Sequence, residues 1–325
     1  MINNSEVIAI DVVVPVFNGE KYITKALQSI CSQTYKVEKI IVVDDGSTDR
    51  TREVISLHQS SIEIQYVRKC NGGPNSARNV GIAHCTSNYI AFLDSDDEWF
   101  DDKLEEQVSL IRKNKFQNLG AVYCGCIIVD ENSNFIRSFP IDKEIRGSIY
   151  NKLFDANKIV SSASGVLIKR HCFDKVGLFD ETLRVGEDWD MWLRLAECYQ
   201  FDFVPKDVVR VRRHENSAQS NKLYSFSHLI DFYNKWGPRI PAGVKSAKKW
   251  RKDILAETVL LFPDPTPVRM IHHNMTPCTR QIIFPLMKGS VLVYLFLSSP
   301  LILLQLCKRA VYKAGLLTKV KRFLQ

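Results

Sequence analysis

The sequence predicts an α/β fold in which a mostly parallel sheet is covered by helices on both faces. Through the first half of the chain, apolar runs of strand length alternate with amphipathic stretches of helix length. The apolar runs are rich in valine and isoleucine and nearly free of polar residues, which is typical of strands that are buried on both faces. Clusters of acidic and small residues follow several of these runs, where the strands of such a sheet end.

The expected elements follow one another in a regular order. Strands are predicted over residues 8–14, 40–43, 62–67 and 89–93, and helices over residues 20–33, 48–58 and 74–84. In the less regular second half, strands are predicted over residues 121–129, 163–169 and 203–211, and a helix over residues 189–199. Because crossovers between parallel strands are right-handed, the carboxyl ends of the strands share one edge, where ligands bind in open α/β sheets.

Composition and charge exclude several classes of protein. The 325 residues are 45% hydrophobic and 25% charged, which excludes a disordered or collagen-like chain. The formal net charge is +8, but Asp264 is the last acidic residue and nine basic residues follow it, so the preceding body is close to neutral. Nucleic-acid-binding domains usually carry a basic face, and we therefore expect no nucleic-acid partner.

The last third of the chain is predicted to form a separate part. We expect a catalytic domain over residues 1–216 and a helical, partly apolar C-terminal extension over residues 217–325. Residues 289–306 carry no charge and have basic flanks, which predicts contact with a membrane surface. At about 1.5 Å per residue this segment is short for a bilayer core of about 30 Å, and Pro300 interrupts it, so an interfacial or re-entrant contact is favoured over a span. The alternative is a helical pair that packs on the catalytic domain.

Two further features concern the compartment. The amino-terminal residues lack a basic segment followed by an apolar one, which argues against secretion. We therefore expect a cytoplasmic protein, peripheral or monotopic at the inner face of the plasma membrane. The chain has nine cysteines, and the close pair Cys124 and Cys126 has no second half that would complete a zinc site. These cysteines are expected to be small apolar side chains that stay reduced.

Three acidic clusters carry the chemistry. Asp44 and Asp45 fit an ordinary turn between strand and helix, but such a turn does not require two adjacent carboxylates. Residues 94–98 hold four carboxylates in five positions, more than a helix cap uses, and their repulsion predicts a bound Mg²⁺ or Mn²⁺. In residues 186–192, acids at a helix start are commonplace, although a carboxylate beside tryptophan can have a raised pKa and act as a general base.

Five stretches of the sequence, taken together and in order, resemble family 2 glycosyltransferases of the GT-A fold. They are residues 14–23, 43–49, 73–81, 93–97 and 186–188, within a region of about residues 8–215 that makes up about two thirds of the chain. The glycine-rich loops of P-loop proteins and of dinucleotide-binding proteins are absent from the sequence, as is the nucleophile elbow of hydrolases. Phosphates are therefore expected to be held by a metal ion and carboxylates.

The resemblance implies roles for individual residues. The residues that it implies for nucleotide binding are Pro15, Asn18, Asp44, Asp45, Arg78 and Asp94. Those that it implies for the metal are Asp94, Asp96 and His214, although a lone histidine is often structural. Ala77 and Gly81 would keep their helix close to the nucleotide, and Arg212 and Arg213 could face the diphosphate. Glu187 and Asp188 would form the catalytic pair, with Asp188 as the base.

The same resemblance implies the reaction. We expect an inverting transfer of a sugar from a nucleotide-diphosphate sugar, with UDP favoured, to a hydroxyl of a glycan or lipid-linked acceptor in surface polysaccharide synthesis. The cofactor would be Mn²⁺ or Mg²⁺, which stabilises the charge of the leaving diphosphate. Two alternatives are a non-catalytic nucleotide-sugar sensor or scaffold on the same fold, and a sugar nucleotidyltransferase.

Overall fold

The structure, a computed structural model, describes residues 7–139, 141–215, 228 and 231–241. The chain divides into two compact units, Met1–Ser220 and Asn221–Gln325. In the second unit, residues 231–236 are helical and the 3₁₀ turn η2 (Gly237–Arg239) follows them. The apolar segment 289–306 lies outside the described residues. Within the described ranges, the structure contains no helix that is both long and apolar enough to cross a membrane.

The first half of the first unit is a parallel sheet, as the sequence predicts. Its strands are β1 (Ile10–Val16), β2 (Lys39–Asp44), β3 (Glu63–Arg68) and β4 (Tyr89–Phe92). They lie in the order β3-β2-β1-β4, and each neighbouring pair is parallel. The register pairs Val16 with Asp44, so β1 and β2 end at the same level of the sheet.

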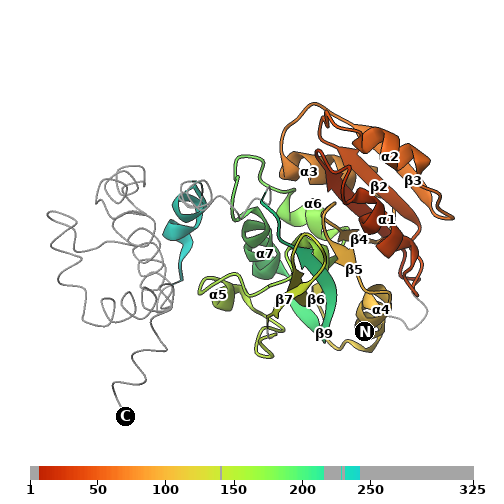
Figure 1. Cartoon of the computed structure of the whole chain (residues 1–325). Helices are drawn as coiled ribbons and strands as arrows, with labels where there is room; N and C mark the ends of the chain where they lie inside the picture. The colour runs from red at the N-terminus through yellow and green to blue at the C-terminus, as the bar shows by residue number, and fades with distance from the viewer. Residues whose placement is uncertain (1–6, 140, 216–227, 229–230, 242–325) are drawn as a thin grey trace, which may run out of the picture. The chain divides into compact units, whose positions relative to one another are not determined.

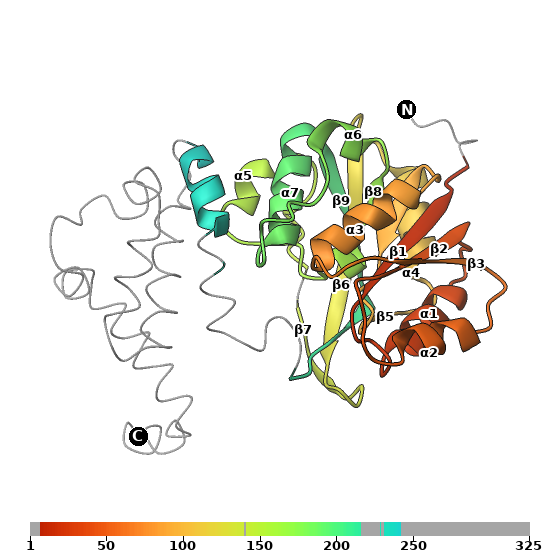
Figure 2. The same ribbon diagram turned by 90° about the horizontal axis from the view of Figure 1, so that it is seen from above.

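Helices cover both faces of this parallel part. The helices α1 (Ile23–Cys31) and α2 (Thr51–Leu57) lie on one face, and α3 (Pro74–His84) lies on the other (Figures 1 and 2). Val12 and Val14 belong to the same buried cluster as the apolar residues of α1, whereas Val13 faces α3. At Gly81 a Cβ atom would lie 2.2 Å from the Val13 side chain, so α3 packs on β1 at a distance that only glycine permits.

The second half of the sheet is mixed rather than parallel. Its strands are β5 (Glu98–Trp99), β6 (Leu119–Val129), β7 (Phe135–Ser138), β8 (Leu167–Lys169) and β9 (Gln200–Arg212). The order continues from β4 as β8-β6-β9-β5, with β7 on β6, and β8 is antiparallel to both of its neighbours. The strand predicted over residues 163–169 is shorter than expected, because residues 163–165 form the 3₁₀ turn η1 (Ala163–Gly165). The Ser164 carbonyl accepts a hydrogen bond from Trp99 Nε1 at 2.7 Å, which holds this turn against β5.

The remaining helices are α4 (Lys103–Lys113), α5 (Tyr150–Leu153), α6 (Cys172–Val176) and α7 (Glu187–Cys198). The helix predicted over residues 189–199 is α7, which begins two residues earlier. The sequence analysis did not predict α4, because polar residues occupy part of its buried face. Lys103 is fully buried, with its Nζ 3.9 Å from the centre of the Trp99 ring and 3.0 Å from Gln107 Oε1.

The cysteines of the described part of the chain are free thiols, as expected. Cys124 and Cys126 are buried on β6, and each Sγ donates to a backbone carbonyl, of Gly165 and Val160 respectively, at 3.3 Å. Burial raises the pKa of both thiols to about 12. Because the thiolate is the form that binds metal and reacts, these side chains are packing residues.

Candidate active site

A cavity of about 730 Å³ opens where β1, β2 and β4 end, and its lining includes the first turns of α3 and α7. Seven of the ten predicted site residues line it: Pro15, Asp45, Arg78, Asp94, Asp96, Glu187 and Asp188. They come from segments up to 173 positions apart in the chain, which the sheet and its crossovers bring to one edge. The other three, Asn18, Asp44 and His214, are not among the residues that line the cavity.

Asn18 and Asp44 hold the loops behind the cavity. Asn18 has a positive φ of 49°, and its side-chain oxygen accepts a hydrogen bond from the Thr48 backbone N–H at 2.8 Å. The buried Asp44 carboxylate accepts hydrogen bonds from the Ser47 N–H at 2.7 Å and from the Tyr66 hydroxyl. Burial by itself raises the pKa of Asp44, but these hydrogen bonds outweigh it and leave the pKa below its usual value. Both residues therefore fix the turn after β2.

Asp45 faces the cavity and orders the loop that precedes α3. One carboxylate oxygen accepts hydrogen bonds from Lys69 Nζ at 2.7 Å and from the Gly72 N–H at 2.9 Å. The other accepts a hydrogen bond from the Gly73 N–H at 2.7 Å. Gly73 has a φ of 91°, which glycine adopts without strain, so the loop can wrap around the carboxylate.

Arg78 links the two groups of acids in the cavity. Its Nη2 lies 2.8 Å from Asp94 Oδ1, and its Nη1 lies 3.7 Å from Glu187 Oε1. The residue is 3% exposed, and its Nε has no hydrogen-bond partner among the described residues. Burial lowers the pKa of the guanidinium, but the charges of Asp94 and Glu187 outweigh this and raise it above its usual value. Arg78 is thus a permanent buried cation that holds two carboxylates.

The four acids of residues 94–98 point to different partners. Asp94 is paired with Arg78, whereas Asp96 Oδ2 lies 3.0 Å from His214 Nε2. Asp97 is buried, and it accepts hydrogen bonds from the Arg212 backbone N–H at 2.9 Å and from Ser164 Oγ at 2.6 Å. Burial and the charges of Asp96 and Asp94 raise the pKa of Asp97 well above its usual value. The remaining acid, Glu98, forms an ion pair with Arg212.

The donor set around Asp96 suits a hard divalent cation. Asp96 and His214 offer a carboxylate and an imidazole within hydrogen-bond distance, and Asp94 lines the same cavity. Oxygen-rich sets of this kind suit Mg²⁺ and Mn²⁺, and imidazole suits Mn²⁺ better than Mg²⁺. In the part of the chain that the structure describes, three or more such side chains do not gather into a ready metal cluster. The residues therefore fit a site that phosphate oxygens or water would complete.

Glu187 and Asp188 begin α7 directly after Gly186, which has a φ of 79°. Asp188 Oδ2 accepts a hydrogen bond from Asn157 Nδ2 at 3.3 Å, and Oδ1 accepts one from the Trp189 N–H at 2.7 Å. Burial raises the pKa of Asp188. Burial and the Asp188 charge raise the pKa of Glu187 to about 7. Both carboxyl groups are therefore poised to take up a proton nearer neutral pH than exposed acids are.

Sequence reasoning missed Asn157 and assigned no role to Ser164. Asn157, which lines the cavity and touches Asp188, lies in a stretch without a recognisable motif. Ser164 accepts a hydrogen bond from the Asp94 N–H at 3.1 Å while donating to Asp97, and its place before β8 gave no sign of either contact. A single asparagine or serine carries no spacing signal, so the fold was needed to find their contacts.

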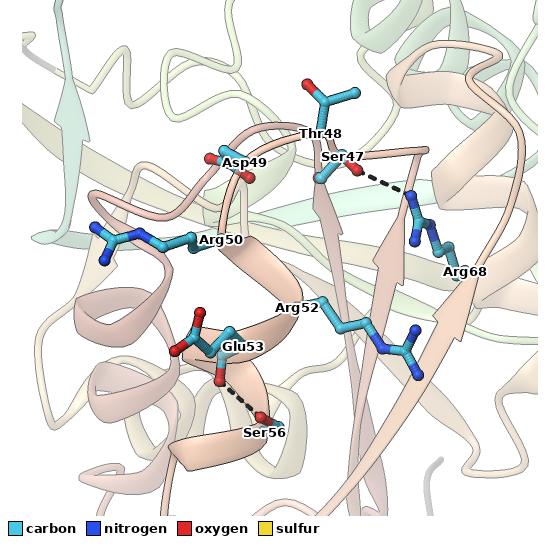
Figure 3. Close-up of a pocket in the computed structure, with 8 residues that line it drawn as sticks. All are labelled: Ser47, Thr48, Asp49, Arg50, Arg52, Glu53, Ser56 and Arg68. Atoms are coloured by element: carbon cyan, nitrogen blue, oxygen red, sulfur yellow. Dashed lines mark hydrogen bonds between the residues drawn. The ribbon is translucent and has the colours of Figure 1, made fainter.

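A second cavity, of about 820 Å³, lies over α2 and shares no lining residue with the first (Figure 3). Figure 3 shows Arg50, Arg52 and Arg68 around it, with the Arg68 side chain bonded to the Ser47 carbonyl at 2.9 Å. Glu53 also lines this cavity, and Arg68 lies within 4.0 Å of Asp44. Its positive charge is thus partly offset by acids.

Comparison with known proteins gives a consistent family. Residues 11–177 match the family model described as Glycosyl transferase family 2. An uncharacterized glycosyltransferase of Rickettsia prowazekii is 31% identical over 227 residues, which cover 69% of this chain and 70% of that protein. Glycosyltransferase GlyA of Streptococcus pneumoniae is 43% identical over 267 residues, which cover 78% of this chain and 34% of that protein. This chain therefore spans about a third of the pneumococcal protein.

Two solved structures share the fold. S. aureus TarS 1-349 in complex with UDP-GlcNAc has a TM-score of 0.59 at 20% identity, over 85% of this chain and 78% of that chain. The mannosyltransferase PcManGT from Pyrobaculum calidifontis, in complex with GDP-Man and Mn²⁺, has a TM-score of 0.56 at 18% identity, over 91% of this chain and 80% of that chain. At these identities the likeness concerns the fold.

Proposed function

The chain belongs to glycosyl transferase family 2, and we propose that it moves a sugar from a UDP-sugar, with inversion, to a hydroxyl of a glycan or lipid-linked acceptor. One observation carries this proposal. A single cavity brings the acids of residues 94–97 next to Glu187 and Asp188, with Arg78 between the two groups. A UDP-sugar is favoured because TarS, which shares the fold, was solved with UDP-GlcNAc.

The roles that we propose follow the geometry. Pro15, Asp45 and Arg78 line the cavity and would contact the nucleotide. Asn18 and Asp44 would not contact the nucleotide but would fix the turn that carries Asp45. Asp94, Asp96 and His214 would hold Mn²⁺ or Mg²⁺, which supplies positive charge for the leaving diphosphate.

The acceptor hydroxyl is a weak nucleophile at neutral pH, so a base is required to remove its proton. We assign this role to Asp188, whose raised pKa makes it a better base than an exposed aspartate. The oxygen then attacks the anomeric carbon on the face opposite the diphosphate, while the bond from that carbon to the diphosphate oxygen breaks and UDP leaves. One displacement of this kind inverts the configuration, and the proton ends on Asp188.

The function is tested by incubating the protein with UDP-sugars and a mixed glycan acceptor and following the release of UDP. We expect release that depends on both the acceptor and Mn²⁺, and a product with inverted anomeric configuration by NMR. Binding of UDP-sugar without release would favour the sensor alternative. Absence of both binding and release with every UDP-sugar would contradict the proposed donor.

Replacement of Asp96 by alanine should weaken nucleotide binding in the presence of Mn²⁺ and leave metal-free binding nearly unchanged. The reason is that Asp96, beside His214, would contact the ion rather than the nucleotide. Loss of one ligand group should cost at least about 10-fold in Mn²⁺-dependent UDP affinity, measured by calorimetry.

Asp174→Ala is the matched control for this experiment, because it removes the same side chain from an exposed position on α6 that does not line the cavity. It should bind UDP as the wild type does. If Mn²⁺ raises the UDP affinity of wild type but not that of Asp96→Ala, the result agrees with the proposed role of Asp96. An unchanged response to Mn²⁺ in Asp96→Ala would remove Asp96 from the metal site.

We further propose that residues 289–306, with their basic flanks, bring the enzyme to the inner face of the plasma membrane. This proposal rests on the sequence, since the segment lies outside the described residues, and it suits an acceptor used in surface polysaccharide synthesis. The full-length chain should sediment with membranes, and a chain truncated before Pro263 should not. Full solubility of both would contradict the membrane contact.

A further inference from the structure

We propose that Arg212 is a positioning residue, which holds Asp96 and His214 together at the cavity and does not itself bind the diphosphate. The inference rests on the proposed function, since it concerns how that site is kept ready for its metal ion. The sequence analysis suggested a diphosphate contact for this arginine, and the geometry points to a different role.

The Arg212 guanidinium is bonded to protein groups through all three of its nitrogens. Nε donates to the Asp96 carbonyl at 3.0 Å, and Nη2 pairs with the Glu98 carboxylate. Nη1 donates to the turn between β6 and β7, where its acceptors are the carbonyls of Asp130 and Glu131 at 3.0 and 3.2 Å and Ser133 Oγ at 3.0 Å. The residue is 1% exposed. A side chain so engaged cannot turn toward a diphosphate without breaking several buried hydrogen bonds.

These bonds join the segments that carry the two metal-binding candidates. Arg212 lies two residues before His214, and it contacts the residues on both sides of Asp97. Its backbone N–H donates to Asp97 Oδ1 at 2.9 Å. The end of β9 and residues 96–98 are thus fixed to each other at three points, which sets the 3.0 Å distance between Asp96 Oδ2 and His214 Nε2.

Tyr22, directly before α1, contacts both Arg212 and His214. The Arg212 guanidinium lies 5.1 Å from the centre of the Tyr22 ring, a cation–π distance. The same ring stacks on the His214 imidazole, with the ring centres 5.2 Å apart. The orientation of His214 therefore depends on a ring that Arg212 also contacts.

The arrangement requires an arginine rather than any cation. The acceptors lie in several directions around one plane, which suits the fixed fork of a guanidinium and not the single ammonium of lysine. The positive charge also lies next to a loop with four carboxylates, whose mutual repulsion would otherwise push the loop open.

The test compares Arg212→Lys and Arg212→Met with wild type by calorimetry of UDP binding with and without Mn²⁺. We expect the gain in UDP affinity caused by Mn²⁺ to fall about 10- to 100-fold in Arg212→Met, the range for partners of metal ligands, and to fall less in Arg212→Lys. Metal-free UDP affinity should stay close to wild type, because the Arg212 guanidinium, although it lines the cavity, is bonded to protein groups.

Arg210→Met is the matched control, because Arg210 lies on the same strand and faces the same acid, with Nη1 3.9 Å from Glu98 Oε2. Its guanidinium lies over the Phe100 ring, whereas the bond to the Asp96 carbonyl belongs to Arg212, so Arg210→Met should keep the full response to Mn²⁺. Where Arg212→Met fails to fold, Glu98→Gln, which removes one partner of the guanidinium, should show a smaller loss in the same direction.

Three outcomes overturn the inference. A Glu98→Gln or Arg212→Lys protein that folds and keeps the wild-type response to Mn²⁺ shows that the bonds do not position Asp96. Equal losses of UDP affinity with and without Mn²⁺ in Arg212→Met show a general structural role. A wild type that binds UDP no better with Mn²⁺ than without contradicts the proposed metal site itself, and the inference fails with it.

Discussion

Replacing Asp188 by asparagine should lower the rate of sugar transfer by about 10²- to 10⁴-fold, the contribution typical of a general base. Asparagine keeps the size of the side chain and its place beside Asn157, but it cannot accept a proton from the acceptor. Nucleotide-sugar binding should stay close to wild type, because the ion pairs of Arg78 are formed with Asp94 and Glu187 and remain in place. Steady-state kinetics together with calorimetry of UDP-sugar binding measure the two effects.

Two variants on the same helix control this experiment. Glu197→Gln changes an exposed acid at the far end of α7 and should leave the rate unchanged. Glu187→Gln should lower the rate less than Asp188→Asn does, because Glu187 is paired with Arg78. Wild-type turnover in Asp188→Asn, or a larger loss in Glu187→Gln, would move the role of base away from Asp188.

The pH profile follows from the same side chains. A base works only when deprotonated, so activity is lost as the pH falls through its pKa. Burial raises the pKa of Asp188, and burial with the Asp188 charge raises that of Glu187 to about 7. The acidic limb of kcat/KM should therefore lie closer to neutral pH than the value of about 4 for an exposed carboxylate.

The part of the fold that the sequence predicted best is the parallel half. There, strands rich in valine and isoleucine and amphipathic helices each give a clear local signal, and the register shows that β1 and β2 end together. The antiparallel strand β8 and the helix α4 were not predicted correctly. The short β8 follows a tight turn at Ser164, and the buried face of α4 includes the polar side chains of Lys103 and Gln107, which hide its apolar pattern.

The candidate site shows a similar division between local and distant information. The acidic clusters could be identified from the sequence alone, and most of their members line one cavity. The direction in which each carboxylate points could not be predicted, because it depends on partners from other segments. Asp44 turns to Tyr66 and not to the cavity, and Asp96 turns to His214, 118 positions away. Arg212 illustrates the same limit, since its acceptors lie on strands and turns far from it in the chain.

Replacing Arg78 by methionine should destabilise the protein by about 3–5 kcal/mol, the cost of removing one partner from a buried ion pair. Methionine fills a similar volume, but it leaves Asp94 and Glu187 without the cation that now offsets their charges. Arg78 lowers the pKa of both Glu187 and Asp188, so its loss should also move the acidic limb of activity to higher pH. Urea unfolding at neutral pH measures the stability, and kcat/KM against pH measures the limb.

The double variant Arg78→Met with Asp94→Asn separates the charge of Arg78 from its packing against Phe179, whose ring centre lies 5.5 Å from the guanidinium carbon. If the lost charge dominates, neutralising Asp94 should recover part of the stability, because the uncompensated carboxylate is removed with its partner. Arg112→Met is the control for the packing effect. Arg112 lies on α4, outside the cavity, and its guanidinium also lies over an aromatic ring, that of Tyr35. A double variant no more stable than Arg78→Met would mean that packing, and not charge, explains why an arginine is buried here. In that case the acidic limb of Arg78→Met should also stay where it is in wild type.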